Sequence, residues 1–176
     1  MTDARLSENR GSKPHRAAVA HASKIGKLAV QARPTDVAET ARVVVDEYRP
    51  QIEAAGLEIA FDADSGIGPI KTDGIRVRQI LSKLIFNAAS CTERGRVRVW
   101  VARSRSGRAP WPGEWVAVNV ADAGRDIPEQ DQHIVFQELV RREPARAHGS
   151  SAFDARITLV GDPGRGSTFT LWLPVS

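Results

Sequence analysis

The sequence has very little of what builds disulfide frameworks, thiolate metal sites or membrane spans. Cys91 is its only cysteine, which excludes an internal disulfide and a multi-thiolate metal site. No apolar run approaches the roughly 20 residues that a bilayer requires. Residues 1–16 are polar and charged and carry no apolar leader segment. We therefore expect a soluble, cytoplasmic protein that makes no contact with a membrane.

The remaining composition is that of a globular protein. The chain has 176 residues, of which 41% are hydrophobic and 26% are charged. This length fits a single domain, because domains typically have about 100 to 200 residues. The net charge is +4. A positive excess of this size favours anionic partners such as nucleotides without selecting one of them.

The chain divides into a short N-terminal part and one domain. Residues 1–16 contain basic clusters and no apolar periodicity, so we expect a frayed tail. From His15 to Val30, apolar residues recur every three positions, which predicts a marginal helix interrupted by Gly26. We therefore divide the chain into residues 1–32, the tail and helix, and residues 33–176, the folded domain.

The middle of the chain predicts two amphipathic helices and a strand. Thr35 or Asp36 can cap a helix whose apolar stripe starts at Val37 and which Gly56 ends. Residues 57–61 alternate between apolar and polar, as in a half-buried strand. A second helix is expected from about Gly74 to Ala89, with a stripe wide enough to pack on a sheet.

The C-terminal half predicts strands. Residues 96–101 and 115–120 alternate and are separated by a turn, so we expect two antiparallel strands. Residues 155–160 and 168–173 flank a glycine-rich turn and predict a closing hairpin. Two helices on one side of four or five mostly antiparallel strands make an α+β fold, a two-layer α/β sandwich.

Four short motifs stand in a fixed order on these elements. They lie at residues 76–95 on the second helix and just after it, at residues 120–128 after a strand, at residues 135–138, and at residues 164–169 before the last strand. They resemble the N box, the G1 box, the F box and the final turn of the catalytic ATP-binding domain of bacterial sensor histidine kinases. This domain belongs to the GHKL, or Bergerat-fold, ATPase superfamily, and its fold agrees with the predicted sandwich.

The resemblance implies a site for ATP or ADP with magnesium. Asn87 would coordinate the magnesium ion, for which an amide oxygen is a suitable ligand. Asp122 would accept a hydrogen bond from the adenine amino group, and Gly124 would let the backbone approach the ring. Thr168 would support Asp122, and Lys83 would lie near the phosphates. No catalytic residue is assigned.

The sequence departs from the family pattern on the phosphate side. Lys83 replaces the first Asn of the N box, Ser90 replaces a Lys, and Asp126 replaces the second Gly of the G1 box. Only residues 148–151 stand where the family has its G2 box, so we expect the ATP lid and the last helix to be shortened or missing. None of the four histidines has the surroundings of a phosphoacceptor histidine.

Each candidate residue also has a purely structural interpretation. Asn87 can be a surface or capping amide, Asp122 and Gly124 can form an ordinary turn, and Thr168 suits a strand. The arginines between residues 94 and 108 can form a solvated face. Nucleic acid is an unlikely partner, because no aromatic stacking pattern accompanies these arginines. Cys91 is expected to be a small buried hydrophobic residue.

Three functions remain open. The first is a degenerate, histidine kinase-like ATP-binding domain in two-component-type signalling, with weak or lost nucleotide binding and a regulatory role. The second is an active stand-alone GHKL kinase that phosphorylates a partner in trans. The third is a nucleotide-free interaction module. The expected partners are an adenine nucleotide, bound weakly, and a protein such as a response regulator or a kinase.

Overall fold

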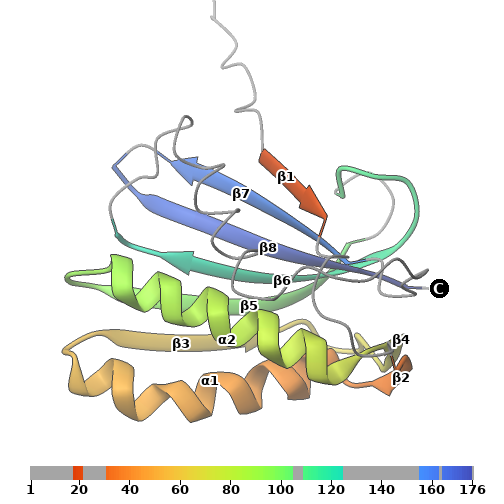
Figure 1. Cartoon of the computed structure of the whole chain (residues 1–176), viewed down its shortest axis with the longest axis horizontal. Helices are drawn as coiled ribbons and strands as arrows, with labels where there is room; N and C mark the ends of the chain where they lie inside the picture. The colour runs from red at the N-terminus through yellow and green to blue at the C-terminus, as the bar shows by residue number, and fades with distance from the viewer. Residues whose placement is uncertain (1–17, 22–30, 105–108, 125–154, 163, 176) are drawn as a thin grey trace, which may run out of the picture.

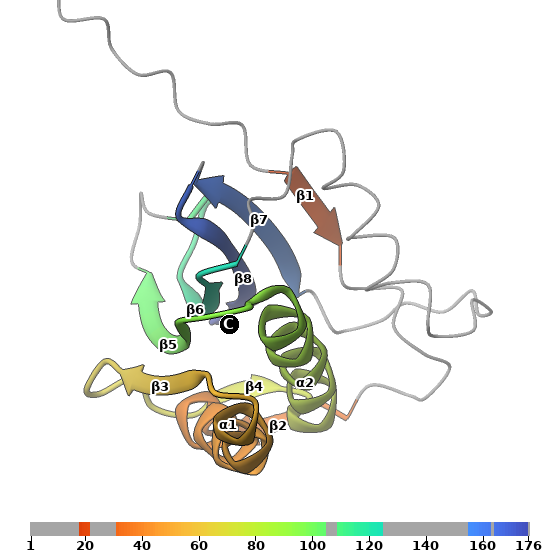
Figure 2. The same ribbon diagram turned by 90° about the vertical axis from the view of Figure 1, so that its left-hand side faces the viewer.

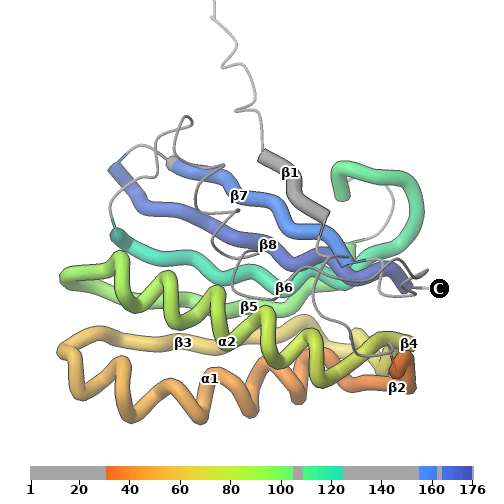
Figure 3. Tube along the Cα trace, in the orientation of Figure 1, coloured from red at the N-terminus to blue at the C-terminus, as the bar shows by residue number. Residues whose placement is uncertain are grey.

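Two helices and a mixed sheet form the two layers of the molecule (Figures 1 and 3). The computed structural model describes residues 18–21, 31–104, 109–124, 155–162 and 164–175. Both helices lie on the same side of the sheet, as the view turned by 90° makes clear (Figure 2). The prediction of an α+β two-layer sandwich is confirmed.

Helix α1, Val37–Ala54, forms as its apolar stripe and its cap predict. Asp36 is the N-cap, and its Oδ1 accepts the backbone N–H of Glu39 at 2.9 Å. The buried side chains are Val37, Ala41, Val44, Val45 and Ile52. Gly56, with φ at +78°, follows the end of the helix, where a residue without a Cβ is favoured.

Helix α2, Gly74–Cys91, is the second predicted helix and extends slightly past Ala89. Asp73 is its N-cap and accepts the backbone N–H groups of Ile75 and Arg76. The buried stripe consists mainly of aliphatic residues, Val77, Ile80, Leu81, Leu84, Ile85 and Ala88. This stripe packs against α1 and the sheet, so the opposite edge of α2 remains available for a site.

The main sheet has six strands in the order β1-β7-β8-β6-β5-β3. Neighbouring strands are antiparallel except β3 and β5, which are parallel. The strands are β1, Ala18–His21; β3, Glu58–Ala63; β5, Arg96–Ser104; β6, Trp115–Asp122; β7, Arg156–Asp162; and β8, Gly166–Pro174. A separate antiparallel pair, β2 (Arg33–Thr35) and β4 (Ile70–Thr72), was not predicted from the sequence.

The prediction of a helix across residues 15–30 is wrong for Ala18–His21. These residues form β1, which pairs with β7 over Ala18↔Leu159 to His21↔Arg156. Pairing with β7 satisfies backbone groups that a short helix interrupted by glycine would hold only weakly. The rest of the expected helix, residues 15–17 and 22–30, and the expected tail lie outside the described residues.

The core lies between the helices and one face of the sheet. Strand residues of one parity point toward the helices and are buried, as Val99, Val118 and Leu171 illustrate. Residues of the other parity lie on the helix-free face. Trp115 and Trp172 lie there, and Trp111 packs against both of them, with ring centroids 5.5 Å and 6.3 Å away. These three tryptophans therefore form a layer of their own over part of the helix-free face.

Candidate functional site

Asp122 is the last residue of β6 and is only 6% exposed. Its parity is that of Val118 and Val120, so its side chain lies on the helix side of the sheet. The carboxylate Oδ1 accepts the N–H of Gly124 at 2.9 Å. The backbone N–H of Ser167, at the start of β8, also donates to this carboxylate. Two backbone donors therefore fix the orientation of a buried acceptor.

Burial raises the pKa of the Asp122 carboxyl, and the N–H groups of Gly124 and Ser167 offset part of that increase. Such a carboxylate lacks the solvation that an exposed one has. A ligand that brings an N–H donor to it would improve its environment. Asp122 is thus suited to recognise a group such as an exocyclic amine.

Gly124 allows the end of β6 to approach the end of α2 very closely. A Cβ at position 124 would lie 2.3 Å from the carbonyl oxygen of Cys91 and 2.9 Å from Oδ1 of Asp122. At Gly166, where φ is +90°, a Cβ would lie 2.0 Å from the carbonyl oxygen of Asp122. Glycine at both positions lets α2, β6 and β8 converge on Asp122.

Asn87 lies on the edge of α2, between Lys83 one turn before it and Cys91 one turn after it. Both Asn87 and Lys83 are partly exposed. Within the described part of the chain, the Asn87 side chain makes no hydrogen bond. Cys91 is close enough to Asp122 for the negative charge to affect its thiol. Lys83, Asn87 and Cys91 therefore form a line along one edge of α2 that leads toward Asp122.

Cys91 is exposed, so the expectation of a buried residue is wrong. It is the last residue of α2, where the helix edge faces out of the core. Partial burial raises the pKa of the Cys91 thiol, and the negative charge of Asp122 raises it further. The thiol is thus accessible but less ionised than an ordinary cysteine.

Thr168 does not lie on the same face of the sheet as Asp122. It pairs with Ala121 and has the parity of Thr170 and Trp172, which face away from the helices. Ser167 has the parity of Asp122 and is 3% exposed. Its Oγ has no hydrogen-bond partner among the described residues. The alternation of Phe169, Leu171 and Leu173 in the sequence already puts position 167, not 168, on the buried face.

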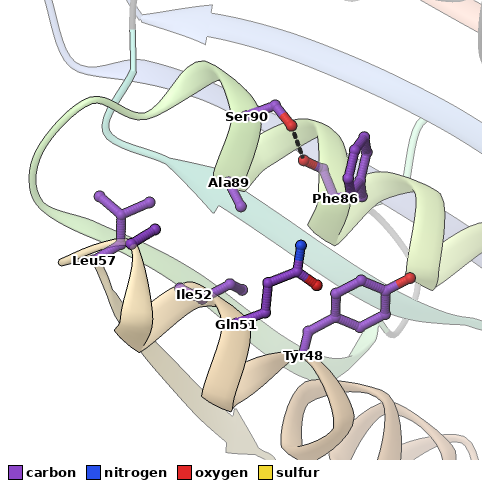
Figure 4. Close-up of a pocket in the computed structure, with 8 residues that line it drawn as sticks. Tyr48, Gln51, Ile52, Leu57, Phe86, Ala89 and Ser90 are labelled. Carbon is purple, nitrogen blue, oxygen red and sulfur yellow. Dashed lines mark hydrogen bonds between the residues drawn. The ribbon is translucent and has the colours of Figure 1, made fainter.

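Ser90 faces a groove between the two helices, not the Asn87 edge of α2. The groove has a volume of about 220 Å³ and a mainly aliphatic floor. Figure 4 shows Phe86 and Ser90 on its α2 side and Tyr48 and Gln51 on its α1 side. Ser90 Oγ donates to the carbonyl oxygen of Phe86 at 2.8 Å, so the hydroxyl is used within the helix.

Part of the predicted site cannot be placed. Asp126, the F-box segment 135–138 and residues 148–151 lie outside the described residues, and so does the expected shortening of the lid and last helix. Among the residues that are described, no group of three or more His, Cys, Asp or Glu side chains could hold a metal ion.

Two arginines on the helix-free face, Arg98 of β5 and Arg156 of β7, have aromatic neighbours. The Arg98 guanidinium lies 5.2 Å from the centroid of the Trp100 ring, and Arg156 lies 4.4 Å from that of Trp111. The guanidinium groups lie over rings of their own chain. These contacts are explained by the structure of the helix-free face and do not require a nucleic acid.

The chain belongs to the family of histidine kinase-, DNA gyrase B- and HSP90-like ATPases, which it matches over residues 72–176. The match covers α2, the turns that contain Gly124 and Gly166, and the strands that carry Asp122 and Ser167. The resemblance read from the four motifs is therefore confirmed.

Curated relatives are sensor kinases. The autoinducer 2 sensor kinase/phosphatase LuxQ of Vibrio parahaemolyticus is 28% identical in an alignment that covers 85% of this chain and 19% of the relative. The adaptive-response sensory kinase SasA of a Synechococcus strain is 27% identical over 85% of this chain and 41% of its own. The chain thus spans well under half the length of these relatives.

Solved structures share the fold. Histidine kinase ThkA, in complex with the response regulator protein TrrA, matches with a TM-score of 0.64 and 19% identity, over 84% of this chain and 42% of that one. Full-length ShkA in complex with AMPPNP matches with a TM-score of 0.62 and 22% identity, over 85% of this chain and 32% of that one.

Among the residues that the structure describes, no helix has the length and apolar character that a membrane span requires.

Proposed function

We propose that this chain is a nucleotide-binding module of two-component-type signalling that holds an adenine nucleotide and transfers phosphate poorly. Its role would be regulatory, exerted through a response regulator or a kinase. The observation that carries the proposal is the buried Asp122 carboxylate, fixed by the N–H of Gly124 at 2.9 Å on the side of the sheet that faces α2.

Asp122 would recognise the adenine amino group. Its remaining acceptor capacity suits an N–H donor, since a carboxylate offers about four lone-pair sites and the two backbone donors use only part of them. Ser167 would assist through its buried Oγ, which has no partner among the described residues and shares the face of Asp122. Ser167 therefore replaces Thr168 as the residue we propose to support the adenine.

Asn87 and Lys83 would serve the phosphate side. A magnesium ion is often held by one or two protein oxygens together with phosphates and water, so a single amide oxygen on Asn87 fits this chemistry. The bound ion would supply charge neutralisation between phosphate groups. Lys83, one turn before Asn87, would contribute positive charge on the same edge of α2.

Poor phosphotransfer is the part of the proposal that rests on sequence departures. Phosphoryl transfer depends on positioning and on positive charge around the transferred group. Ser90 supplies no charge at the position where the family has a lysine, and its hydroxyl bonds to Phe86. Asp126 would add negative charge near the phosphates. Both changes reduce the positive charge that phosphoryl transfer requires.

The deciding experiment is a thermal-shift titration with ATP and with ADP, each with and without magnesium. A ligand that binds only the folded state raises its stability by RT ln(1 + [L]/Kd), which is about 2.7 kcal/mol at 100 times Kd. We expect stabilisation by both nucleotides and its loss in Asp122→Ala. Assays of ATP turnover with purified response regulators should show little phosphotransfer.

Three outcomes would contradict the proposal. No shift at millimolar nucleotide would favour a scaffold that acts only through protein contacts. Rapid phosphorylation of an added protein would instead establish an active kinase acting in trans. A nucleotide-dependent shift that persists unchanged in Asp122→Ala would show binding at a different place in the molecule.

A further inference from the structure

The segment before α1 is attached to the beginning of α2 by three separate contacts. We define residues 31–35, which include β2, as the connector. The backbone N–H of Gln31 donates to Asp73 Oδ2 at 3.0 Å, across 42 positions of sequence. Thr35 Oγ1 shares its single hydrogen between the carbonyl oxygens of Arg33, at 2.9 Å, and Thr72, at 3.1 Å, and β2 pairs with β4 from Arg33↔Thr72 to Thr35↔Ile70.

The two carboxylate oxygens of Asp73 have different partners. Oδ1 accepts the N–H groups of Ile75 at 3.1 Å and Arg76 at 3.2 Å, which is the helix cap. Oδ2 accepts the connector N–H of Gln31 and lies 3.5 Å from Nε of Arg76. Asp73 and Arg76 are 5% and 6% exposed. One buried side chain thus joins the connector to the first turn of α2.

The packing beside Asp73 leaves little room for independent movement. A Cβ placed on Gly74 would lie 3.1 Å from Cγ2 of Thr35, so the connector lies directly against the start of the helix. Along α2, Asn87 is about 21 Å from Asp73 at 1.5 Å per residue. Since α2 is one continuous helix from Gly74 to Cys91, its cap and Asn87 lie on the same element at a set separation.

We propose that Asp73 is a positioning residue that makes the connector and α2 move together, so that displacement of the chain ahead of Gln31 changes the position of Asn87. The effect on nucleotide rests on the proposed function, whereas the mechanical link does not. Asp122, on β6, lies on a different element. Movement of α2 would therefore alter magnesium-dependent binding more than adenine recognition.

Asp73→Asn keeps the cap of α2 and removes the bond to Gln31, and it also weakens the 3.5 Å contact between Oδ2 and the Arg76 guanidinium. Asparagine is an equally good cap through Oδ1, but its amide nitrogen in place of Oδ2 cannot accept the Gln31 N–H. Asp36→Asn is the matched control, because Asp36 caps α1 through Oδ1 and its second oxygen has no hydrogen bond among the described residues. Both variants lose one negative charge at a helix cap.

The first measurement is hydrogen exchange without nucleotide. We expect Asp73→Asn to speed exchange of connector amides by about tenfold, the effect of losing a hydrogen bond to a charged group. Asp36→Asn should leave the connector unchanged. Thr35→Val, which removes the bond to Thr72, provides a second test if Asp73→Asn does not fold. Unchanged connector exchange in both Asp73→Asn and Thr35→Val would overturn the link.

The second measurement is the ratio of ADP affinities with and without magnesium. We expect this ratio to fall several-fold in Asp73→Asn and to stay at the wild-type value in Asp36→Asn. If Asp73 has only a structural role, Asp73→Asn should lower the melting temperature but leave the ratio of ADP affinities of the folded protein unchanged. That result would overturn the positioning role. If the wild type binds no nucleotide, the proposed function fails, while hydrogen exchange still decides the link.

Discussion

The backbone N–H of Gly124 donates to the carboxylate of Asp122 at 2.9 Å, and the same glycine lies against the carbonyl oxygen of Cys91 at the end of α2. This contact brings the last residue of a strand to the edge of the helix that carries Asn87 and Lys83. The candidate site thus depends on one close approach between two backbones.

Asp122→Asn should raise stability and weaken nucleotide binding. Burial raises the pKa of Asp122, so the native carboxylate is less favourable than the unfolded one above the ordinary pKa. Asparagine removes this penalty, and its Oδ1 can still accept the Gly124 N–H. We expect the free energy of unfolding at pH 7 to increase.

The pH dependence checks the cause of that change. As pH falls through the raised pKa, the wild-type carboxyl becomes protonated and its penalty disappears. The stability advantage of Asp122→Asn should therefore shrink toward zero in acid. Urea denaturation across this pH range measures it, and an advantage that grows in acid would contradict the assignment.

The loss of stability caused by a glycine-to-alanine change should be larger where the added Cβ comes closer to neighbouring atoms. Gly166→Ala combines positive φ with a clash against the Asp122 carbonyl, and we expect it to be the most harmful. Gly124→Ala should destabilise by about 1 to 3 kcal/mol, because its Cβ would overlap the Cys91 carbonyl. A Cβ at position 164 would meet no neighbouring atom, so Gly164→Ala should cost only the backbone strain of positive φ, about 1 kcal/mol of stability. This variant serves as the control. Melting temperatures give the order.

Cys91 should react slowly with iodoacetamide for an exposed thiol. Thiolate is the reactive form, and partial burial followed by the charge of Asp122 raises the pKa of Cys91. Asp122→Asn should speed alkylation modestly, since it removes the smaller of the two causes. Mass spectrometry of timed samples at pH 8 measures the rate. A rate equal to that of free cysteine would contradict the raised pKa.

Asn87→Ala should remove the magnesium-dependent part of nucleotide binding. If Asn87 is the protein ligand of the ion, affinity for ADP with magnesium should fall by about tenfold, while affinity without magnesium stays near the wild-type value. Calorimetric titration measures both. Phe86→Ala is the control, because the neighbouring side chain faces the α1 groove. Equal losses with and without magnesium would argue against a metal-binding role.

Trp111→Ala should destabilise the helix-free face. Trp111 contacts Trp115, Trp172 and the Arg156 guanidinium. Aromatic pairs contribute about 0.5 to 1.5 kcal/mol each beyond burial, so we expect a loss of about 2 to 3 kcal/mol in urea denaturation. Phe86→Ala, whose residue is 49% exposed, should have a smaller effect. A loss no larger than that of Phe86→Ala would show that the layer contributes little.

The alternation of residues along β8 shows how much of the candidate site could be predicted from the local sequence pattern. Alternation of Phe169, Leu171 and Leu173 already determined which residues face the core, and hence that Ser167 shares the face of Asp122. Thr168 was predicted from its place in a motif. Extending the period of two through the turn at Gly166 points to Ser167 instead.

The sequence by itself determined both helices, because their caps and apolar stripes are interactions between residues three or four apart. It also determined the position of Asp122 at the end of a strand. Only the tertiary structure decided the pairing of β1 with β7, the bond from Gln31 to Asp73 and the gathering of tryptophans on one face. These contacts join residues far apart in the chain, and local propensity carries no information about which distant backbone groups remain available to pair.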